Sequence, residues 1–381
     1  MPPPESQPPR RQPQAVLSPL TEAALFLVVT VDAGGEQVAH ELLADLSGLV
    51  RAVGFRVPEG ALTCVTGIGS RAWDRLFSGN RPAELHEFVE LTGPRHHAPS
   101  TPGDLLFHIR ARSMDLCFEL ASQIMERLRG AVTVRDEVHG FRYFENRDLL
   151  GFVDGTENPA GYAAERATLV AAEDDPEFAG GSYVIVQKYV HDLQAWNALP
   201  VEAQELAMGR RKLTDIELDD ASKPADSHVA ANTITGADGE QRQILRDNMP
   251  FGSVGAGEFG TYFIGYCHTP ETTEQMLRNM FLGRPEAGGR GDRILDFSTA
   301  LTGCLFYCPT SDFLDDPPDL PDLSASAATG AAPAASPAAV PSQAAPSASE
   351  TVPAAPPAAA TEPPPRDPFG SLGIGGLKET P

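Results

Sequence analysis

The stretch GFVDGTENP, residues 151–159, is the most informative part of this chain of 381 residues. It places one carboxylate, Asp154, directly after an apolar pair and directly before a glycine. Gly155 lets the backbone turn sharply or approach a flat ligand closely, and Asn158 with Pro159 is typical of the end of a turn. An isolated Asp-Gly pair is most often an ordinary surface turn. Nine residues in this order are more specific, and they predict a tight loop that presents a single acid.

The residues before this stretch predict an α+β unit with helices on one face of an antiparallel sheet. Apolar runs and helical spacing indicate the order strand–helix–strand–strand–helix–strand, which is the ferredoxin-like order. The predicted strands are 24–31, 62–69, 105–110 and 132–138, and the predicted helices are 37–53 and 114–128. The residues after the stretch have the same mixed make-up, with strands at 181–190, 260–267 and 301–307 and helices at 192–199, 200–208 and 271–281.

Both ends of the chain differ in composition from the middle. Residues 1–20 are Pro-rich and are expected to be disordered. Residues 316–365 are rich in Ala, Pro and Ser, which predicts a flexible linker with a coil span of roughly 40 Å. The final segment, 366–381, contains spaced aliphatic residues between glycines. A long linker that ends in such a peptide indicates that the peptide has a role of its own.

The chain is strongly acidic, with 29 Lys and Arg against 52 Asp and Glu and a formal net charge of −23. This charge repels phosphate backbones and anionic lipid headgroups, so we expect neither nucleic acid nor a membrane as a partner. Arg10 and Arg11 are followed by Gln and Pro rather than by an apolar core, so no signal peptide is expected. Five scattered cysteines are typical of reduced thiols in a cytoplasmic protein.

The nine histidines of the chain do not by themselves select a metal ligand. His96 and His97 lie in a polar Gly-Pro-flanked loop and are expected to be solvated. His108 lies in an apolar strand, where an isolated histidine is more often a packed core residue. His228 lies in PADSHVAANT, residues 224–233, whose small side chains leave room for a planar ring.

A further segment, ILRDNMPFG at residues 244–252, contains Arg246 and Asn248. On composition alone, a charged loop is the ordinary interpretation. GFVDGTENP, however, resembles the signature of the dye-decolorising peroxidases, haem enzymes that reduce hydrogen peroxide, and is most similar to their bacterial B-type branch. The segments around His228 and Arg246 are similar to two further segments of that family and follow in the same order. The resemblance runs from about residue 25 to residue 310.

The resemblance implies an α+β fold of two ferredoxin-like domains with antiparallel sheets, at 21–150 and 151–315, with haem bound mainly by the second. It implies one haem b per subunit, with His228 as the axial ligand of the iron. The implied catalytic residues are Asp154, Arg246 and Asn248, and the implied cofactor-binding residues are His228, Arg246, Gly155, Thr156 and Asp292. Asp292 and Asp296 are both candidates to bind the other ring nitrogen of His228, and Asp292 is favoured.

Cleavage of peroxide to give a high-valent iron–oxo state requires these residue types. A carboxylate moves a proton from the inner to the outer oxygen. A guanidinium stays charged and stabilises the departing hydroxide, and the Asn248 amide fixes peroxide or a water. How Asp154 and Arg246 divide this work is left open. Dyes or other bulky and phenolic compounds are the implied reductants. Surface aromatic residues are a route by which their electrons could reach a buried haem, but Trp73 and Trp196 are expected to be packing residues.

The C-terminal segment DPFGSLGIGGLKET is similar to the cargo-loading peptides that dock proteins inside encapsulin nanocompartments. Its spaced aliphatic residues suit an extended peptide in a groove. The similarity implies an encapsulin shell protein as partner, bound through Asp367–Pro381, and a location in the cytoplasm inside that compartment. Family members also form homo-oligomers, from dimers to hexamers.

Two other functions are weighed against a peroxidase. Asp154–Gly–Thr resembles the nucleophile loop of a haloacid-dehalogenase-like phosphatase. That loop needs a second carboxylate two positions away and a parallel sheet, and Phe152 and the antiparallel strand pattern both argue against it. The second alternative is a protein that binds or stores haem, or removes its iron. A haem absorption band separates haem binding from a phosphatase, and reaction with peroxide separates an enzyme from a store.

Overall fold

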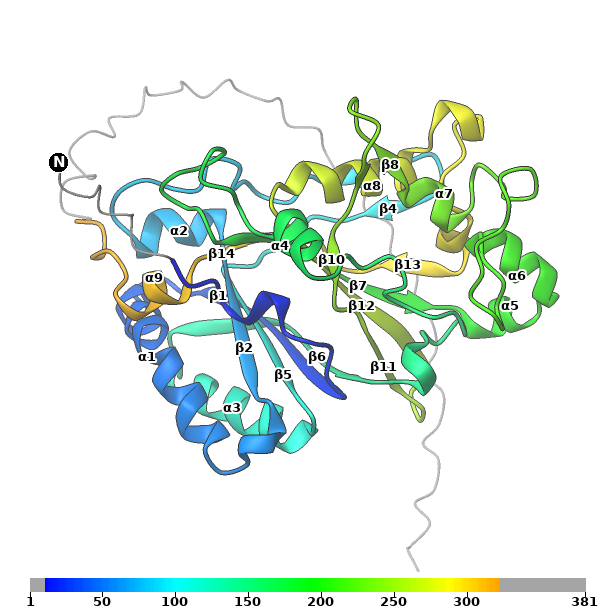
Figure 1. The fold of residues 1–381 in the computed structure, drawn as a ribbon. Helices are drawn as coiled ribbons and strands as arrows, with labels where there is room; N and C mark the ends of the chain where they lie inside the picture. Colours follow the sequence, from blue (N-terminus) through cyan, green and yellow to red (C-terminus); the bar gives the residue numbers. More distant parts are fainter. Residues whose placement is uncertain (1–10, 323–381) are drawn as a thin grey trace, which may run out of the picture. The chain divides into compact units, whose positions relative to one another are not determined.

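The computed structural model describes residues 11–322, which belong to one compact unit. The predicted C-terminal peptide and nearly all of the predicted linker lie outside the described residues. Figure 1 shows the arrangement of the described elements.

The first half has the predicted ferredoxin-like order. Its elements are β1(Ala23–Val31), α1(Glu36–Gly54), β2(Thr63–Gly69), β5(Leu105–Ala111), α3(Met114–Arg127) and β6(Val132–Phe141). The strands lie in the order β2-β5-β1-β6, and every neighbouring pair is antiparallel. α1 and α3 lie side by side on one face of these strands (Figure 1). The α+β prediction is therefore confirmed for this half.

The second half repeats this order. Its elements are β7(Ser182–His191), α5(Leu193–Asn197), α6(Val201–Met208), α7(His228–Asn232), β10(Leu245–Arg246), β11(Met249–Ser253), β12(Glu258–Cys267), α8(Pro270–Leu282) and β14(Cys304–Cys308). β10 and β11 both pair with β12, which pairs with β7, which pairs with β14, all antiparallel. The segment with Arg246 and Asn248 is thus part of the sheet edge and not a charged loop.

The two halves share one sheet. β14 pairs with β2, with Phe306 opposite Gly69 and Tyr307 opposite Ile68. Composition and periodicity did not predict this pairing, because β14 and β2 lie far apart in the sequence. The remaining elements are η1(Ala15–Leu17), η2(Pro58–Gly60), α2(Ser70–Leu76), β3(Leu91–Thr92), β4(His97–Ala98), η3(Phe144–Asn146), α4(Tyr162–Thr168), β8(Ile234–Thr235), β9(Gln241–Arg242), η4(Pro285–Ala287), η5(Arg293–Asp296), β13(Ser298–Ala300) and α9(Ser311–Asp315).

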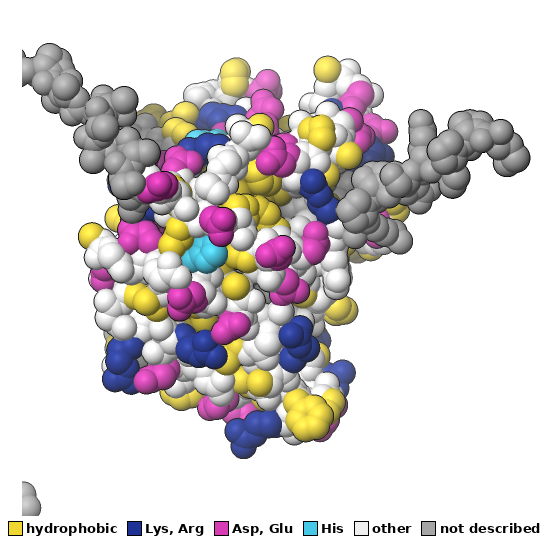
Figure 2. Space-filling view, turned by 90° about the vertical axis from the view of Figure 1, so that its left-hand side faces the viewer, with side chains coloured by type: hydrophobic (Ala, Val, Ile, Leu, Met, Phe, Trp, Pro, Cys, Tyr) yellow, Lys and Arg dark blue, Asp and Glu magenta, His cyan; other side chains and the backbone are white. Residues whose placement is uncertain are grey.

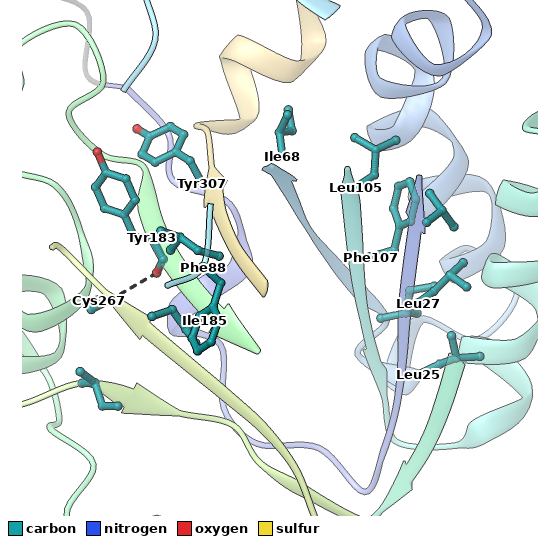
Figure 3. Close-up of a cluster of buried hydrophobic side chains, with 14 of the residues drawn as sticks. Leu25, Leu27, Ile68, Phe88, Leu105, Phe107, Tyr183, Ile185, Cys267 and Tyr307 are labelled. Atoms are coloured by element: carbon teal, nitrogen blue, oxygen red, sulfur yellow. Dashed lines mark hydrogen bonds between the residues drawn. The ribbon is translucent and has the colours of Figure 1, made fainter. Parts of the chain in front are cut away.

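Alternate residues of the strands supply two hydrophobic cores. Leu25 and Leu27 of β1 point towards the helices, together with Phe107 and Ile185 of other strands (Figure 3). Phe26, the residue between the two leucines, points to the opposite face and stacks on Tyr262 of β12 with ring centroids 4.2 Å apart. The two halves of the sheet therefore pack against each other as well as against helices. Full burial of each such side chain stabilises the fold by about 1.5–3 kcal/mol.

The charged surface, the cysteines and the tryptophans can be compared with what the sequence predicts. On the face shown in Figure 2, acidic and basic side chains are interspersed with hydrophobic ones. The five cysteines are free thiols, and four of them are buried. Trp73 and Trp196 are both buried, which is the packing role that was considered ordinary for them. Among the described residues, no helix is long and apolar enough to cross a membrane.

Candidate active site

A large cavity in the second half of the described chain brings together most of the predicted site residues. Its volume is about 1370 Å³ including the open mouth. Asp154, Arg246, Asn248 and His228 all line it. Apolar side chains from the elements around it form much of the wall: Phe152, Met208, Phe263, Met276, Leu277, Met280, Ile294 and Leu295. Every lining residue comes from position 148 or later, so none comes from the strands and helices of the first half, which end at Phe141.

The signature turn presents Asp154 to this cavity. Gly155 has φ +79°, a left-handed conformation that favours glycine, and its carbonyl accepts a hydrogen bond from the Asn158 N–H at 3.0 Å. The Asp154 N–H donates to the Asn146 carbonyl at 2.8 Å. The loop is therefore held at both ends, and the Asp154 carboxylate is aimed from a fixed backbone.

Asn248 is oriented by two contacts. Its Oδ1 accepts from the backbone N–H of Ile264 at 3.0 Å, so its Nδ2 must face the other way. Nδ2 donates to Oδ2 of Asp154 at 3.0 Å. Asn248 lies in the short break between β10 and β11, where its side chain contacts Ile264 of β12. The amide thus links the sheet edge to the acid of the signature turn.

Arg246 projects into the cavity from β10. Its Nε is buried and has no hydrogen-bond partner among residues 11–322. A buried guanidinium N–H without a partner costs free energy on the order of 1–3 kcal/mol. The donor set of Arg246 is therefore suited to a ligand with acceptor atoms in this cavity.

His228 is the first residue of α7. Ser227 caps this helix, its side chain accepting from the Ala230 N–H at 3.4 Å. His228 Nδ1 lies 2.6 Å from Oδ2 of the buried Asp292. Burial of the imidazole lowers its pKa, but the adjacent Asp292 carboxylate outweighs burial and raises the pKa of His228 above its ordinary value. Nε2 makes no hydrogen bond within the described part of the chain.

The chain segments that carry His228 and Asp292 are joined by ion pairs. The buried Asp226 carboxylate accepts a hydrogen bond from Arg290 Nε at 2.9 Å, and its Oδ1 forms an ion pair with Arg293 Nε at 2.7 Å. Asp292 itself caps η5, its Oδ1 accepting from the Ile294 N–H at 2.9 Å. These contacts bring together two segments that are 64 positions apart in the sequence.

A second, smaller pocket adjoins the same residues. Asp154, Gly155, Arg246 and Asn248 line both pockets, whereas His228 lines only the large one. The three polar side chains therefore lie on the wall between the two pockets. His228, at the start of α7 and held by Asp292, lies away from this smaller pocket.

Other candidates lie elsewhere. Asp296 contacts His96 Nε2 at 3.0 Å and Arg95 at 2.8 Å, and not His228. His96 is therefore paired and partly buried, rather than solvated as predicted. His108 is fully buried in the core, with Nδ1 2.8 Å from the Tyr266 hydroxyl, as predicted.

Thr156 lines the cavity at an exposed position, and its hydroxyl donates to Asp215 at 2.7 Å. Sequence reasoning missed Asp148, which also lines the cavity and whose pKa is raised by burial to about 7. It stands six positions before Asp154, in a segment without a pattern that marks an acid as buried.

Gly155→Ala is expected to destabilise the protein more than Gly130→Ala. Both glycines have left-handed φ values, +79° and +75°, so both substitutions carry the cost of about 1–2 kcal/mol for an L-residue in this conformation. A Cβ on Gly155 would also lie 3.2 Å from Nδ2 of Asn158, whereas one on Gly130 would meet nothing within 4 Å. Urea unfolding of the two variants measures the difference. Equal losses in the free energy of unfolding would contradict the predicted contact.

Comparisons with known proteins identify the family of this chain. The profile for the Dyp-type peroxidase N-terminal domain matches residues 13–142, and the one for the C-terminal domain matches residues 145–313. A dye-decolorizing peroxidase of Rhodococcus erythropolis is 66% identical over 321 residues, covering 84% of this chain and 93% of that protein. One from Brevibacterium linens is 54% identical over 376 residues and 98% of both chains.

Solved structures show the same fold. The encapsulated DyP-type peroxidase from Mycobacterium smegmatis superposes with a TM-score of 0.80 at 63% identity, over 82% of this chain and 100% of that one. A DypB variant from Rhodococcus jostii RHA1 in complex with heme superposes with a TM-score of 0.77 at 55% identity, over 81% of this chain and 99% of that one. The two ferredoxin-like halves, the two matching profiles and the close relatives lead to one conclusion: this chain belongs to the dye-decolorising (Dyp-type) peroxidase family.

Proposed function

We propose that this protein is a haem-dependent peroxidase that reduces hydrogen peroxide and oxidises dyes or other bulky and phenolic reductants. The observation that carries the proposal is the cavity itself. His228, whose Nδ1 is held by the buried Asp292, lines this cavity together with Asp154, Arg246 and Asn248. Family membership supports the same reaction class.

The residues present fit a haem. The cavity has room for a flat macrocycle, and its wall is mainly apolar with a few convergent polar groups, as in most cofactor sites. His228 offers one ring nitrogen without a partner among the described residues, and neutral imidazole is a common axial ligand of haem iron. The unpartnered Nε of Arg246 suits an anionic or acceptor group in the same space.

On the His228 side, the side chains would hold and tune the iron. Nε2 of His228 would be the ligand, since Nδ1 is already engaged by Asp292. A carboxylate on the second ring nitrogen fixes the tautomer and orientation of a ligating histidine and raises its basicity. When bound, the haem supplies the redox chemistry with peroxide. Asp292 is therefore assigned the role of holding His228 in the binding orientation.

On the other wall, three side chains would handle the proton and the charge of peroxide. Asp154 is placed to accept the peroxide proton at a carboxylate oxygen and return it to the leaving oxygen. Arg246 keeps its positive charge and would stabilise the hydroxide that departs. Asn248 Nδ2 donates to the Asp154 carboxylate and would hold that carboxylate in place beside peroxide.

Reaction of the haem-loaded protein with hydrogen peroxide tests this proposal. We expect rapid consumption of peroxide and oxidation of an added dye, and stopped-flow absorption measures both. A protein that binds haem but consumes no peroxide, or that yields metal-free porphyrin, would instead act as a haem store or an iron-release protein.

We also propose that the chain is cargo of an encapsulin shell in the cytoplasm. The encapsulated Mycobacterium smegmatis relative supports this, and so does the C-terminal peptide of the sequence. The proposed division of the chain is domains at 21–150 and 151–315, a linker at 316–365 and a targeting peptide at 366–381. The predicted disordered tail at 1–20 is wrong for residues 11–20, where Gln14 and Val16 are buried. We also propose that the protein forms a homo-oligomer of two to six subunits.

Deletion of Asp367–Pro381 is expected to leave peroxidase activity unchanged and to abolish co-purification with a co-expressed encapsulin shell. The reason is that every residue lining the cavity precedes position 299, whereas the peptide lies at the end of the chain. A length-matched control replaces Leu372, Ile374 and Leu377 by serine and should behave like the deletion. Retained co-purification of either variant would show that the shell binds another part of the chain.

A further inference from the structure

The side-chain amide of Asn158 contacts the backbone of Arg246 at both of its polar groups. Oδ1 of Asn158 accepts from the Arg246 N–H at 3.0 Å, and Nδ2 donates to the Arg246 carbonyl at 2.7 Å. β10 is the edge strand of the sheet, and β12 lies on its other side. The amide thus takes the place of a neighbouring strand at this one residue.

We infer that Asn158 is a positioning residue that fixes Arg246 relative to Asp154, and this inference rests on the proposed peroxidase function. Asn158 and Asp154 lie on the same turn, so the two hydrogen bonds tie the turn that carries the acid to the strand that carries the guanidinium. Arg246 is in a strand of only two residues, which has few backbone contacts of its own to hold it.

Asn158 acts on the reaction only through its neighbours. It lines neither the large cavity nor the smaller pocket, so it is not placed to touch peroxide or cofactor. Gly155 supports the arrangement, because a Cβ at this position would lie 3.2 Å from the Asn158 Nδ2. A second, weaker contact points the same way: Gln243 Nε2 donates to the Glu157 carbonyl at 3.3 Å.

The chain offers a matched control in Gln14. Its amide also clamps main-chain groups, accepting from the Thr66 N–H at 2.8 Å and donating to the Thr66 carbonyl at 2.9 Å and the Pro309 carbonyl at 2.8 Å. Gln14 lines neither pocket. Gln14→Ala therefore removes an equivalent clamp without affecting Arg246.

The kinetic test is a double-mutant cycle on the haem-loaded protein. A misplacement of about 1 Å in a reacting group lowers a rate by roughly 10²-fold, so Asn158→Ala should slow the reaction with peroxide by about 10- to 10²-fold. In an Arg246→Ala background the same change should have no further effect, because coupled residues are not additive. Gln14→Ala should leave the rate unchanged.

A second measurement does not depend on activity. Hydrogen exchange of the Arg246 amide in the haem-free protein should be protected in the wild type and in Gln14→Ala, and should lose protection in Asn158→Ala. Unchanged protection, or a full additional loss of rate in the Arg246→Ala background, overturns the inference. An Arg246→Ala enzyme as fast as the wild type overturns the proposed role of Arg246 and the inference with it. If Arg246→Ala reacts slowly with peroxide but Asn158→Ala reacts as fast as the wild type, the positioning inference is wrong and the proposed role of Arg246 still holds.

Discussion

His228→Ala protein is expected to lose haem on gel filtration and to lack a haem absorption band and peroxidase activity. The change removes the ring nitrogen that is free to bind iron and leaves the buried Asp292 without its partner. Loss of groups that merely support a metal ligand costs about 10–100-fold in affinity or activity, so loss of the ligand itself should cost on the order of 10²-fold or more. Absorption spectra of the reconstituted variant and wild type measure the effect.

Two variants separate ligation from general damage. His97→Ala is the control, because His97 is exposed, pairs with Glu90 at 2.7 Å and does not line the cavity. It should keep haem and full activity. Asp292→Asn retains His228 and should bind haem with lower activity, since an amide raises the basicity of the imidazole less than a carboxylate does. Full haem binding by a folded His228→Ala protein would show that another residue is the ligand.

Arg246→Ala is expected to lower the second-order rate constant for peroxide by about 10²–10³-fold, which is typical when one donor to a developing negative charge is removed. Haem should stay bound, because His228 and its partner Asp292 are left unchanged. Stopped-flow mixing with peroxide measures the rate constant, and the unreacted spectrum confirms that the cofactor is present.

Arg246→Lys provides the graded comparison. A lysine keeps the positive charge but loses the planar fork of donors, so its rate constant should lie between those of Arg246→Ala and the wild type. A rate constant for Arg246→Ala within about threefold of the wild type would show that Asp154 and Asn248 suffice.

The order of strands and helices was predictable because each half repeats a local pattern. The continuous apolar run Ala24–Val31 predicts a strand buried on both faces, and the helical spacing within Glu36–Gly54 predicts a helix buried on one face. β10 and β11 were not predictable in this way. They are two and five residues long, which is too short to show a periodic pattern. They form strands because their backbones pair with β12.

The site itself required the family resemblance. Composition left His228 as one candidate among several histidines, and nothing in the residues alone distinguished Asp292 from Asp296. The fold distinguishes the two acids. The ion pairs of Asp226 hold the segment of Asp292 beside His228, whereas Asp296 contacts His96. Contacts between segments this far apart leave no periodic trace in the sequence.

A crystal structure of the haem-loaded protein tests the central claim most directly. We predict that Nε2 of His228 binds the iron while Nδ1 stays on Asp292, and that Asp154, Arg246 and Asn248 lie over the opposite face of the haem. An iron bound by any other residue, or a haem with His228 and Asp154 on the same face, would contradict the account.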